Sequence, residues 1–399
     1  YINDRPVLIM SWDCHTWYAN SCAIKTAGIR PDAPDPSNSM EKDENGNLTG
    51  VFNDTASYPL QVMLIRPLEE RKKSLSLFLR QMNAVGITTI GDVFPYGVTE
   101  PYTLYKAMDE EDGLTARICF YPSLLDFTEK EVSAFQKNYH SDLLRFSGLK
   151  AILDGVLTVH TAWMLDPYSN KPDTCGGPVI DEKLLEKKVL EACSLGINCR
   201  IHAIGDAAIR YSLDCYEKAL DRYGPISRRH TIEHVEYCDP ADVPRFGQLG
   251  VVADMHPRHL TFYIDNALDY LGKEREAHTW LMRDILNAGG IIGTGSDYPV
   301  VNFNPMLGIY AAVARADDNG HPAGGWHPEQ KLTLPEILKI YTIGSAIAMN
   351  IEQDTGTLEP EKSADITVLD TDIFHISDRD LLNVKPVMTM TAGTIVYEA

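Results

Sequence analysis

The sequence predicts an α/β fold: a (β/α)8 TIM-type barrel that lacks its first strand, followed by the C-terminal part of a small β-sandwich domain. From about residue 66, short β-branched runs alternate with helical segments, which is the pattern of a parallel sheet with crossover helices. After residue 356 the pattern changes to short strands separated by glycine turns. Hydrophobic residues make up 44% and charged residues 23% of the 399 residues, as in ordinary globular proteins.

Seven runs are predicted as barrel strands, and each follows a helical segment. The strand runs are 86–93, 116–121, 149–154, 198–203, 229–234, 250–255 and 290–297. The helical segments are 67–85, 101–110, 128–138, 181–195, 206–222, a short stretch after 239–240, 276–287 and 334–349. A closed barrel of this type needs eight strands, so one strand is lacking.

The strand that the barrel lacks is its first one, because the first 65 residues supply no strand–helix unit. Turn-forming clusters at 31–36 and 44–47 predict an inserted cap or loop there instead of a strand–helix unit. The chain starts at Tyr1 and enters a strand-like run at 5–10, so we expect the first barrel strand to belong to an upstream segment that this chain lacks. The expected organisation is a cap segment (1–65), a barrel with strands two to eight (66–355) and the C-terminal part of a small β-domain (356–399).

The net charge and the cysteine content indicate which kinds of partner and which cellular compartment to expect. The formal net charge of −20 argues against nucleic acid and anionic membranes, because both select clustered Lys and Arg. The eight cysteines are scattered and form no CxxC pair, so we expect buried thiols in a reducing, cytoplasmic compartment. No apolar run is long enough to predict a membrane span. A small-molecule substrate is the expected partner, and a homodimer is left open.

Four polar residues fall near the carboxyl ends of different predicted strands, where barrel enzymes place their active sites: Lys150, His202, His234 and Asp297. Imidazole nitrogen and carboxylate oxygen together suit Zn²⁺ and similar ions. A lysine in an apolar setting loses charge, and its neutral amine can take up CO₂ to form an anionic carbamate. Each residue also has a structural interpretation, such as a core histidine, a strand-end lysine or a helix N-cap. The spacing alone leaves both interpretations open.

Several motifs resemble the type-3 amidohydrolases, the branch that contains the N-substituted formamide deformylases. The resemblance covers nearly the whole chain. The motifs are 13–15, 20–21, 27–29 and 50–51 near the start, then 202–208, 232–234 with Asp239 and 245–246, 295–300, 341–342 and 356–365.

The resemblance implies a barrel that holds one or two divalent metals, with zinc the expected ion. Lys150 would be a carbamylated bridging ligand, His202 and His234 would be ligands, and Asp297 would be both ligand and general base. The implied reaction is hydrolysis of a non-peptide carbon–nitrogen bond in an amide, formamide or cyclic amide, by a metal-activated water.

The sequence departs from the family pattern in ways that bear on activity. The family carries a His-x-His pair on strand one, and this sequence contains none, so we expect depleted metal in this chain. The segment 157–161 also differs, which points to a different substrate. His259, His160 and His15 are the candidate substrate contacts. The alternative function is a non-catalytic or regulatory barrel without a complete metal centre, and a lyase or isomerase on the same barrel is also open.

Overall fold

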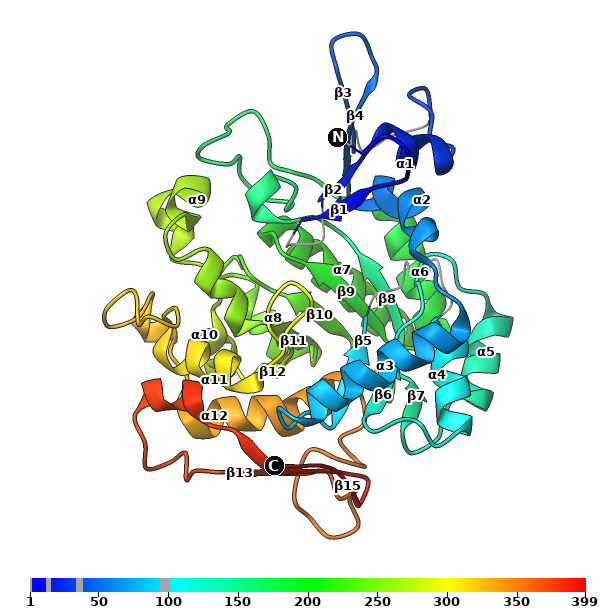
Figure 1. Ribbon diagram of the computed structural model, residues 1–399. Helices are drawn as coiled ribbons and strands as arrows, with labels where there is room; N and C mark the ends of the chain where they lie inside the picture. Colours follow the sequence, from blue (N-terminus) through cyan, green and yellow to red (C-terminus); the bar gives the residue numbers. More distant parts are fainter. Residues whose placement is uncertain (1, 12–15, 34–38, 94–100) are drawn as a thin grey trace.

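The computed structural model describes residues 2–11, 16–33, 39–93 and 101–399. Two parallel sheets occupy the centre, and helices lie around them (Figure 1). A separate antiparallel sheet lies at each end, so that the N-terminus is at the top and the C-terminus at the bottom of this view. The described residues contain no helix that is long and apolar enough to cross a membrane.

The parallel strands form one sheet of three and one of five. The first has the order β5 (Thr89–Asp92), β6 (Arg117–Phe120), β7 (Leu144–Phe146). The second has the order β12 (Ile291–Thr294), β11 (Val252–Met255), β10 (Thr231–His234), β9 (Cys199–Ala203), β8 (Leu149–Ile152). A parallel bridge between Ser123 and Lys150 connects the segment after β6 to β8. Each of the seven predicted runs contains one of these strands, whereas β7 was not predicted.

Most crossover helices match the predicted segments. They are α3 (Leu68–Asn83), α4 (Pro101–Glu110), α5 (Glu129–Asn138), α6 (Glu182–Ser194), α7 (Asp206–Tyr223), α8 (Val243–Leu249), α9 (Ala267–Glu276), α10 (Met282–Asn287), α11 (Pro305–Ala314), α12 (Leu334–Lys339) and α13 (Ser345–Ala348). Helix starts carry the expected caps: Thr128 and Glu131 form a capping box at α5, and the Asp181 carboxylate accepts from the backbone of α6.

Two predicted helices differ from the structure, and α9 and α11 were not predicted. The predicted helix 276–287 is helical only from Met282, where α10 starts, and α9 ends at Glu276 before it. Trp280 between them has φ 45°, a left-handed conformation that cannot continue an α-helix. The segment 334–349 contains a π-helical stretch, Ile340–Gly344, between α12 and α13.

The first 65 residues are more regular than the predicted cap or loop. Four short antiparallel strands form a sheet with the order β1 (Leu8–Met10), β2 (Thr16–Ala19), β4 (Leu48–Asn53), β3 (Met40–Lys42). Two short helices, α1 (Ser21–Thr26) and α2 (Tyr58–Gln61), accompany the sheet. Trp17, Phe52 and Leu60 belong to a small hydrophobic cluster that is separate from the main core. This sheet therefore has its own apolar core, although its strands come from separate stretches of sequence.

The C-terminal strands form a three-stranded antiparallel sheet in the order β13 (Ile366–Leu369), β14 (Pro386–Thr391), β15 (Thr394–Glu398). The run after residue 386 forms a hairpin, in agreement with the predicted short strands and glycine turns, and Ala392 and Gly393 make its turn. Both have positive φ, 48° and 81°, as a two-residue type I′ turn requires. The Thr389 hydroxyl donates to the Asn83 carbonyl (2.7 Å) and so ties this sheet to α3.

Candidate metal-binding active site

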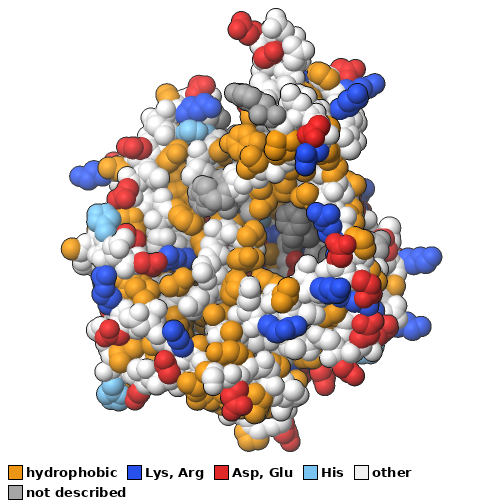
Figure 2. Space-filling model, in the orientation of Figure 1, with side chains coloured by type: hydrophobic (Ala, Val, Ile, Leu, Met, Phe, Trp, Pro, Cys, Tyr) orange, Lys and Arg blue, Asp and Glu red, His pale blue; other side chains and the backbone are white. Residues whose placement is uncertain are grey.

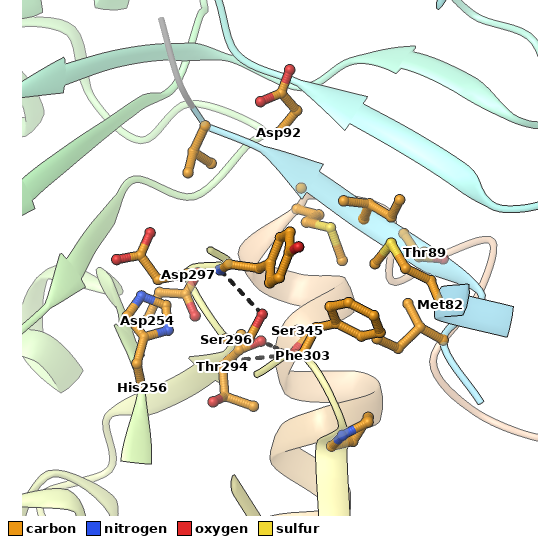
Figure 3. A pocket seen from close by; sticks show the side chains of 18 of the residues that line it. Met82, Thr89, Asp92, Asp254, His256, Thr294, Ser296, Asp297, Phe303 and Ser345 are labelled. Carbon is orange, nitrogen blue, oxygen red and sulfur yellow. Dashed lines mark hydrogen bonds between the residues drawn. The ribbon is translucent and has the colours of Figure 1, made fainter. Parts of the chain in front are cut away.

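A cavity of about 1000 Å³ lies between β5 and the segment that follows β12, and it extends past the amino end of β5 to residues 365–369. On one side it is lined by β5, and on the other by the segment 294–297 that ends and follows β12. In Figure 3, Asp254, His256 and Asp297 lie together at one wall, while Thr89 and Asp92 of β5 lie across from them. On the face shown in Figure 2, hydrophobic side chains gather around the middle, and most charged side chains lie toward the edges.

Strand register explains which polar side chains meet at this wall. Lys150 of β8 is opposite Arg200 of β9, and His202 of β9 is opposite Glu233 of β10, which in turn is opposite Asp254 of β11. Alternate residues of a strand point to the same face, so Arg200 and His202 share one. The register therefore collects these five polar side chains on one surface of the five-stranded sheet.

Four of these side chains form a buried network of ion pairs. Lys150 contacts the Glu233 carboxylate, whose other oxygen accepts from Arg200 Nε at 2.6 Å. Arg200 also contacts Asp254, and all four side chains are at most 6% exposed. Burial, together with the positive charge of Arg200, lowers the pKa of Lys150 well below its usual value, although Asp297 opposes this shift. Lys150 is therefore a lysine whose neutral form is favoured by its surroundings.

Four histidines lie close together next to this network. The ring centroids of His202 and His234 are 4.2 Å apart, and those of His234 and His256 are 4.9 Å apart. The centroids of His256 and His259 are separated by 5.2 Å. All four residues are buried. Burial first, and then the neighbouring histidines and Lys150, lower the pKa of His234 well below its usual value. A neutral imidazole is the form in which histidine binds metals.

His234 reaches this cluster because the backbone leaves the strand geometry at that point. Its φ is 74°, and Val235 follows with φ 48°. Two successive residues with positive φ are uncommon outside glycine and end the alternation of the strand. Glu233 and His234, which are neighbours in sequence, can therefore both contribute to one site.

Asp297 and His259 belong to the outer part of the same group. Asp297 also has a positive φ of 54°, and its side chain is 31% exposed. Its Oδ2 is 4.0 Å from His259 Nε2, while His259 Nδ1 lies 3.2 Å from the Glu236 carboxylate. Burial lowers the pKa of His259, but the hydrogen bond and charge of Glu236, together with Asp297, outweigh it and leave this pKa raised. His234, Glu236 and His259 offer ligand atoms that all lie within 4.8 Å of one another.

Asp154 organises the loop that carries β9 into α7. Its carboxylate accepts hydrogen bonds from the backbone N–H groups of Trp163 (2.9 Å), Ile204 (3.0 Å) and Gly205 (2.9 Å). Its Oδ1 is also 3.6 Å from His202 Nε2. Complete burial raises the pKa of Asp154 to about 7, against the effect of these hydrogen bonds. Asp154 thus fixes the backbone that directly follows His202 and ties it to the backbone of Trp163.

Gly205 is expected to tolerate no side chain, because a Cβ there would lie 2.0 Å from the Trp163 carbonyl oxygen. We expect Gly205→Ala to lower the free energy of unfolding by about 1–3 kcal/mol, as the backbone near Asp154 has to move. Urea unfolding measures this change. The control is Gly177→Ala, whose Cβ would have nothing within 4 Å. Equal unfolding midpoints for the two variants would show that the close approach of Gly205 to Trp163 is unimportant.

The structure brings the four predicted ligands to the same region. Lys150, His202, His234 and Asp297 all line the cavity. The three candidate substrate contacts differ in position. His259 is buried next to Asp297, although it is not itself among the cavity-lining residues. His160 follows the 3₁₀ turn Leu157–Val159, lies 3.0 Å from Asn170 Oδ1, packs against Tyr168 and is not among the cavity-lining residues. His15 lies outside the residues that the structure describes.

Comparison with known proteins places the chain in a family. A family model described as the amidohydrolase family matches residues 1–397. The chain belongs to the amidohydrolase family. This confirms the resemblance to the type-3 branch that the motifs predicted.

Curated relatives of this amidohydrolase match almost all of it. Protein LONG AFTER FAR-RED 3 of Arabidopsis thaliana is 30% identical over 98% of this chain and 69% of the relative. The putative amidohydrolase YtcJ of Bacillus subtilis is 28% identical, over 99% of this chain and 74% of that protein. The N-substituted formamide deformylase of Arthrobacter pascens is 26% identical with the same two coverages.

Solved structures show the same fold. An uncharacterized metal-dependent hydrolase from Pyrococcus horikoshii superposes with a TM-score of 0.77 at 23% identity, covering 94% of this chain and 73% of that one. A second, from Pyrococcus furiosus, gives a TM-score of 0.71 at 22% identity, over 91% and 71% of the two chains. This amidohydrolase therefore shares their α/β architecture with parallel sheets.

The motifs did not single out Arg200, Glu233 or Asp254 as members of the site. A signal for them exists in the sequence, because each is a charged residue inside a strand of otherwise buried, mostly apolar residues. Charged side chains are rarely fully buried unless they are paired. Three such residues in three consecutive strands could have been recognised as a buried ionic network.

Proposed function

We propose that this amidohydrolase is a metal-dependent hydrolase of non-peptide carbon–nitrogen bonds, in which a water attacks an amide, formamide or cyclic amide. The observation that carries the proposal is the convergence of a buried lysine, three buried histidines (His202, His234 and His256) and Asp297 at one cavity, with His259 next to them. Membership of the amidohydrolase family supports the hydrolase class. The relative from Arthrobacter pascens, an N-substituted formamide deformylase, supports an amide-type substrate.

The residues at the cavity fit a divalent metal ion. His234 Nδ1 and Asp254 Oδ1 are buried and have no hydrogen-bond partner among the described residues. Such atoms are costly to leave unpaired, and a cation is one partner that either of them could take. In this proposal Lys150, as its carbamate, His202, His234 and Asp297 hold the ion, and zinc suits this set of nitrogen and oxygen donors. The favoured neutral form of Lys150 supports carbamate formation, and Arg200 supplies a positive charge next to it.

The mechanism assigns a role to each side chain at the cavity. The metal, when bound, polarises the substrate carbonyl and lowers the pKa of a water. Asp297, which is partly exposed at the cavity, accepts the proton of the attacking water and returns it to the departing amine. His259, held by Glu236, contacts the substrate oxygen from the other side of Asp297. Asp154 keeps His202 in place through the backbone of the β9–α7 loop.

The cavity also supports a substrate with an apolar or aromatic substituent on nitrogen. Phe78, Tyr298 and Phe303 line it and pack against one another with ring centroids 5.0 to 5.7 Å apart. Aromatic side chains of this kind bind flat apolar groups. We therefore propose N-substituted amides with a hydrophobic amine portion as the substrate class.

We further propose that seven of the eight parallel strands, β5, β6 and β8 to β12, belong to an eight-stranded barrel, with β7 as an additional short strand beside β6. Among the described residues, β5 pairs only with β6 and β12 pairs only with β11, so each has a free edge toward the cavity. The eighth strand belongs between these edges, and the described residues do not supply it. By resemblance to the family, that strand would carry the His-x-His pair.

Metal binding tests the proposed ligands directly. After chelation, zinc is titrated into the purified protein by calorimetry and bound metal is measured by elemental analysis. We expect His202→Asn to weaken zinc binding by at least about tenfold, because a ligand is lost. His375→Asn is the control, since its side chain is 82% exposed. Equal affinities for the two variants would remove His202 from the metal site.

Activity is tested with a panel of N-formyl and N-acyl amines, with zinc in excess because the chain lacks the family's His-x-His pair and is expected to bind metal weakly. Release of the free amine from members with a hydrophobic amine portion is the expected result. If the protein binds zinc but hydrolyses none of the panel, the proposed reaction is wrong, although the metal site would stand.

A further inference from the structure

Two cysteines and a histidine meet at the amino ends of β9 and β10, away from the cavity. Cys193 lies in the last turn of α6, Cys199 is the first residue of β9 and His230 directly precedes β10. Their ligand atoms all lie within 4.8 Å of one another. His202, by contrast, lies near the carboxyl end of β9. This group is therefore separate from the proposed metal site.

Local backbone structure brings the two cysteines together. α6 ends in a Schellman motif, in which the Ile197 N–H donates to the Ala192 carbonyl (3.0 Å) and the Gly196 N–H donates to the Cys193 carbonyl (2.9 Å). Gly196 adopts φ 70°, which glycine accepts without strain. The chain reverses at this point, so Cys199 comes back alongside Cys193. A short loop thus holds the two thiols next to each other before any bond forms.

His230 is oriented to polarise Cys193. Its Nδ1 accepts a hydrogen bond from the Cys199 backbone N–H (3.0 Å), so in the neutral ring Nε2 carries the proton. That Nε2 lies 3.6 Å from Cys193 Sγ and can donate to it. Tyr216 stacks on the ring with centroids 4.3 Å apart, which fixes its plane. Because Nδ1 is already an acceptor and Nε2 carries hydrogen, the ring is not arranged to bind a metal.

We propose that Cys193 is a reactive thiol, activated by His230, which forms a disulfide with Cys199 when the protein meets a peroxide. The Cys193 thiolate attacks one oxygen of hydrogen peroxide, the O–O bond breaks, and the departing hydroxide takes up a proton to leave as water. Cys199 then attacks the sulfur of the resulting sulfenic acid. The S–S bond forms, and the hydroxyl group leaves as water with the proton of Cys199. The two sulfurs lose two electrons, and the peroxide gains them.

Electrostatics and access agree with this assignment. Hydrogen bonds from Cys199 and from His230 lower the pKa of Cys193 to about 5, although burial opposes them. Cys193 is 4% exposed and His230 is partly exposed, whereas Cys199 is fully buried. An oxidant the size of water is therefore expected to reach Cys193 first. Cys238, a buried thiol whose pKa burial raises well above its usual value, provides the contrast.

Mass spectrometry of the full chain tests the proposal, because both cysteines fall in one tryptic peptide, 189–200. After mild treatment with hydrogen peroxide, we expect this peptide to be lighter by two hydrogens and to resist alkylation until it is reduced. Cys199→Ser should stop at a sulfenic acid on Cys193 that a 1,3-diketone traps. Cys193→Ser should give neither product. Cys238→Ser, the control, should behave as the unmodified chain does.

A second measurement distinguishes activation of Cys193 by His230 from the mere closeness of the two thiols. Alkylation of Cys193 at pH 6 should slow by at least about tenfold in His230→Gln, because a smaller fraction of the thiol is ionised. Circular dichroism checks that each variant is folded. Three results would overturn the proposal: full alkylation of both cysteines after peroxide, a disulfide from Cys199 to Cys215 instead, or stoichiometric zinc on the reduced chain that Cys193→Ser abolishes.

Discussion

Replacing Asp297 with asparagine is expected to lower kcat for hydrolysis of N-substituted amides by about 10²- to 10⁴-fold. Asparagine keeps the size of the side chain but cannot accept the proton of the attacking water. A positioned general base typically accelerates a reaction by a factor of this order. Asp297 is the carboxylate at the cavity that is both partly exposed and within 4.0 Å of His259. Steady-state kinetics on zinc-loaded protein, with bound metal measured in the same samples, checks the prediction.

Asp173→Asn is the matched control for this experiment, because Asp173 is exposed and does not line the cavity. It should leave kcat and KM unchanged. If Asp297→Asn binds as much zinc as the unmodified protein and keeps kcat within about threefold, Asp297 is not the base. A loss of both metal and activity would instead assign it the role of ligand.

Glu233→Ala is expected to lower the free energy of unfolding by about 3–5 kcal/mol. Removal of this carboxylate deprives the buried Arg200 cation of one of its two carboxylate partners, and it leaves the Lys150 amine without its partner. Breaking one member of a buried ion pair typically costs this much, because the remaining charge is uncompensated. Urea unfolding followed by circular dichroism gives the difference.

The comparison variant is Glu186→Ala, which removes a 2.7 Å ion pair with Lys218 at the surface. Such pairs contribute at most about 1 kcal/mol, so its midpoint should hardly move. The double variant Lys150→Met/Glu233→Leu replaces both buried polar side chains by apolar ones and should recover part of the stability lost in Glu233→Ala. Similar losses for Glu233→Ala and Glu186→Ala would mean that the buried network contributes no more than a surface pair.

The parallel strands could be predicted because their signal is local. Buried strands such as β9 and β11 show as short, mostly apolar runs between helices whose caps are also local, such as Asp181. The four proposed ligands were predicted together for a related reason. Parallel strands end on the same side of a sheet, so residues near the carboxyl ends of successive strands become neighbours.

Other features depend on residues that are distant in sequence. The antiparallel sheet in the first 53 residues pairs β2 with β4, across residues that contain no periodic signal of their own. The turn between β14 and β15 was indicated by Gly393, but the sequence does not show that Ala392, which is not a typical residue for positive φ, occupies the first turn position. Cys193 and Cys199 were interpreted as scattered buried thiols, since the role of His230 becomes visible only when β9 and β10 lie side by side.

The sequence by itself determined which runs become parallel strands, and hence that Lys150, His202, His234 and Asp297 share one end of the molecule. Only the tertiary structure decided how those side chains are directed: the positive φ at His234 and Asp297, the pairing of Lys150 with Glu233, and the turn of His160 toward Tyr168 instead of the cavity. The physical reason is that strand and helix patterns depend on neighbouring residues, whereas backbone strain and buried charge pairing are stable only when remote segments pack around them.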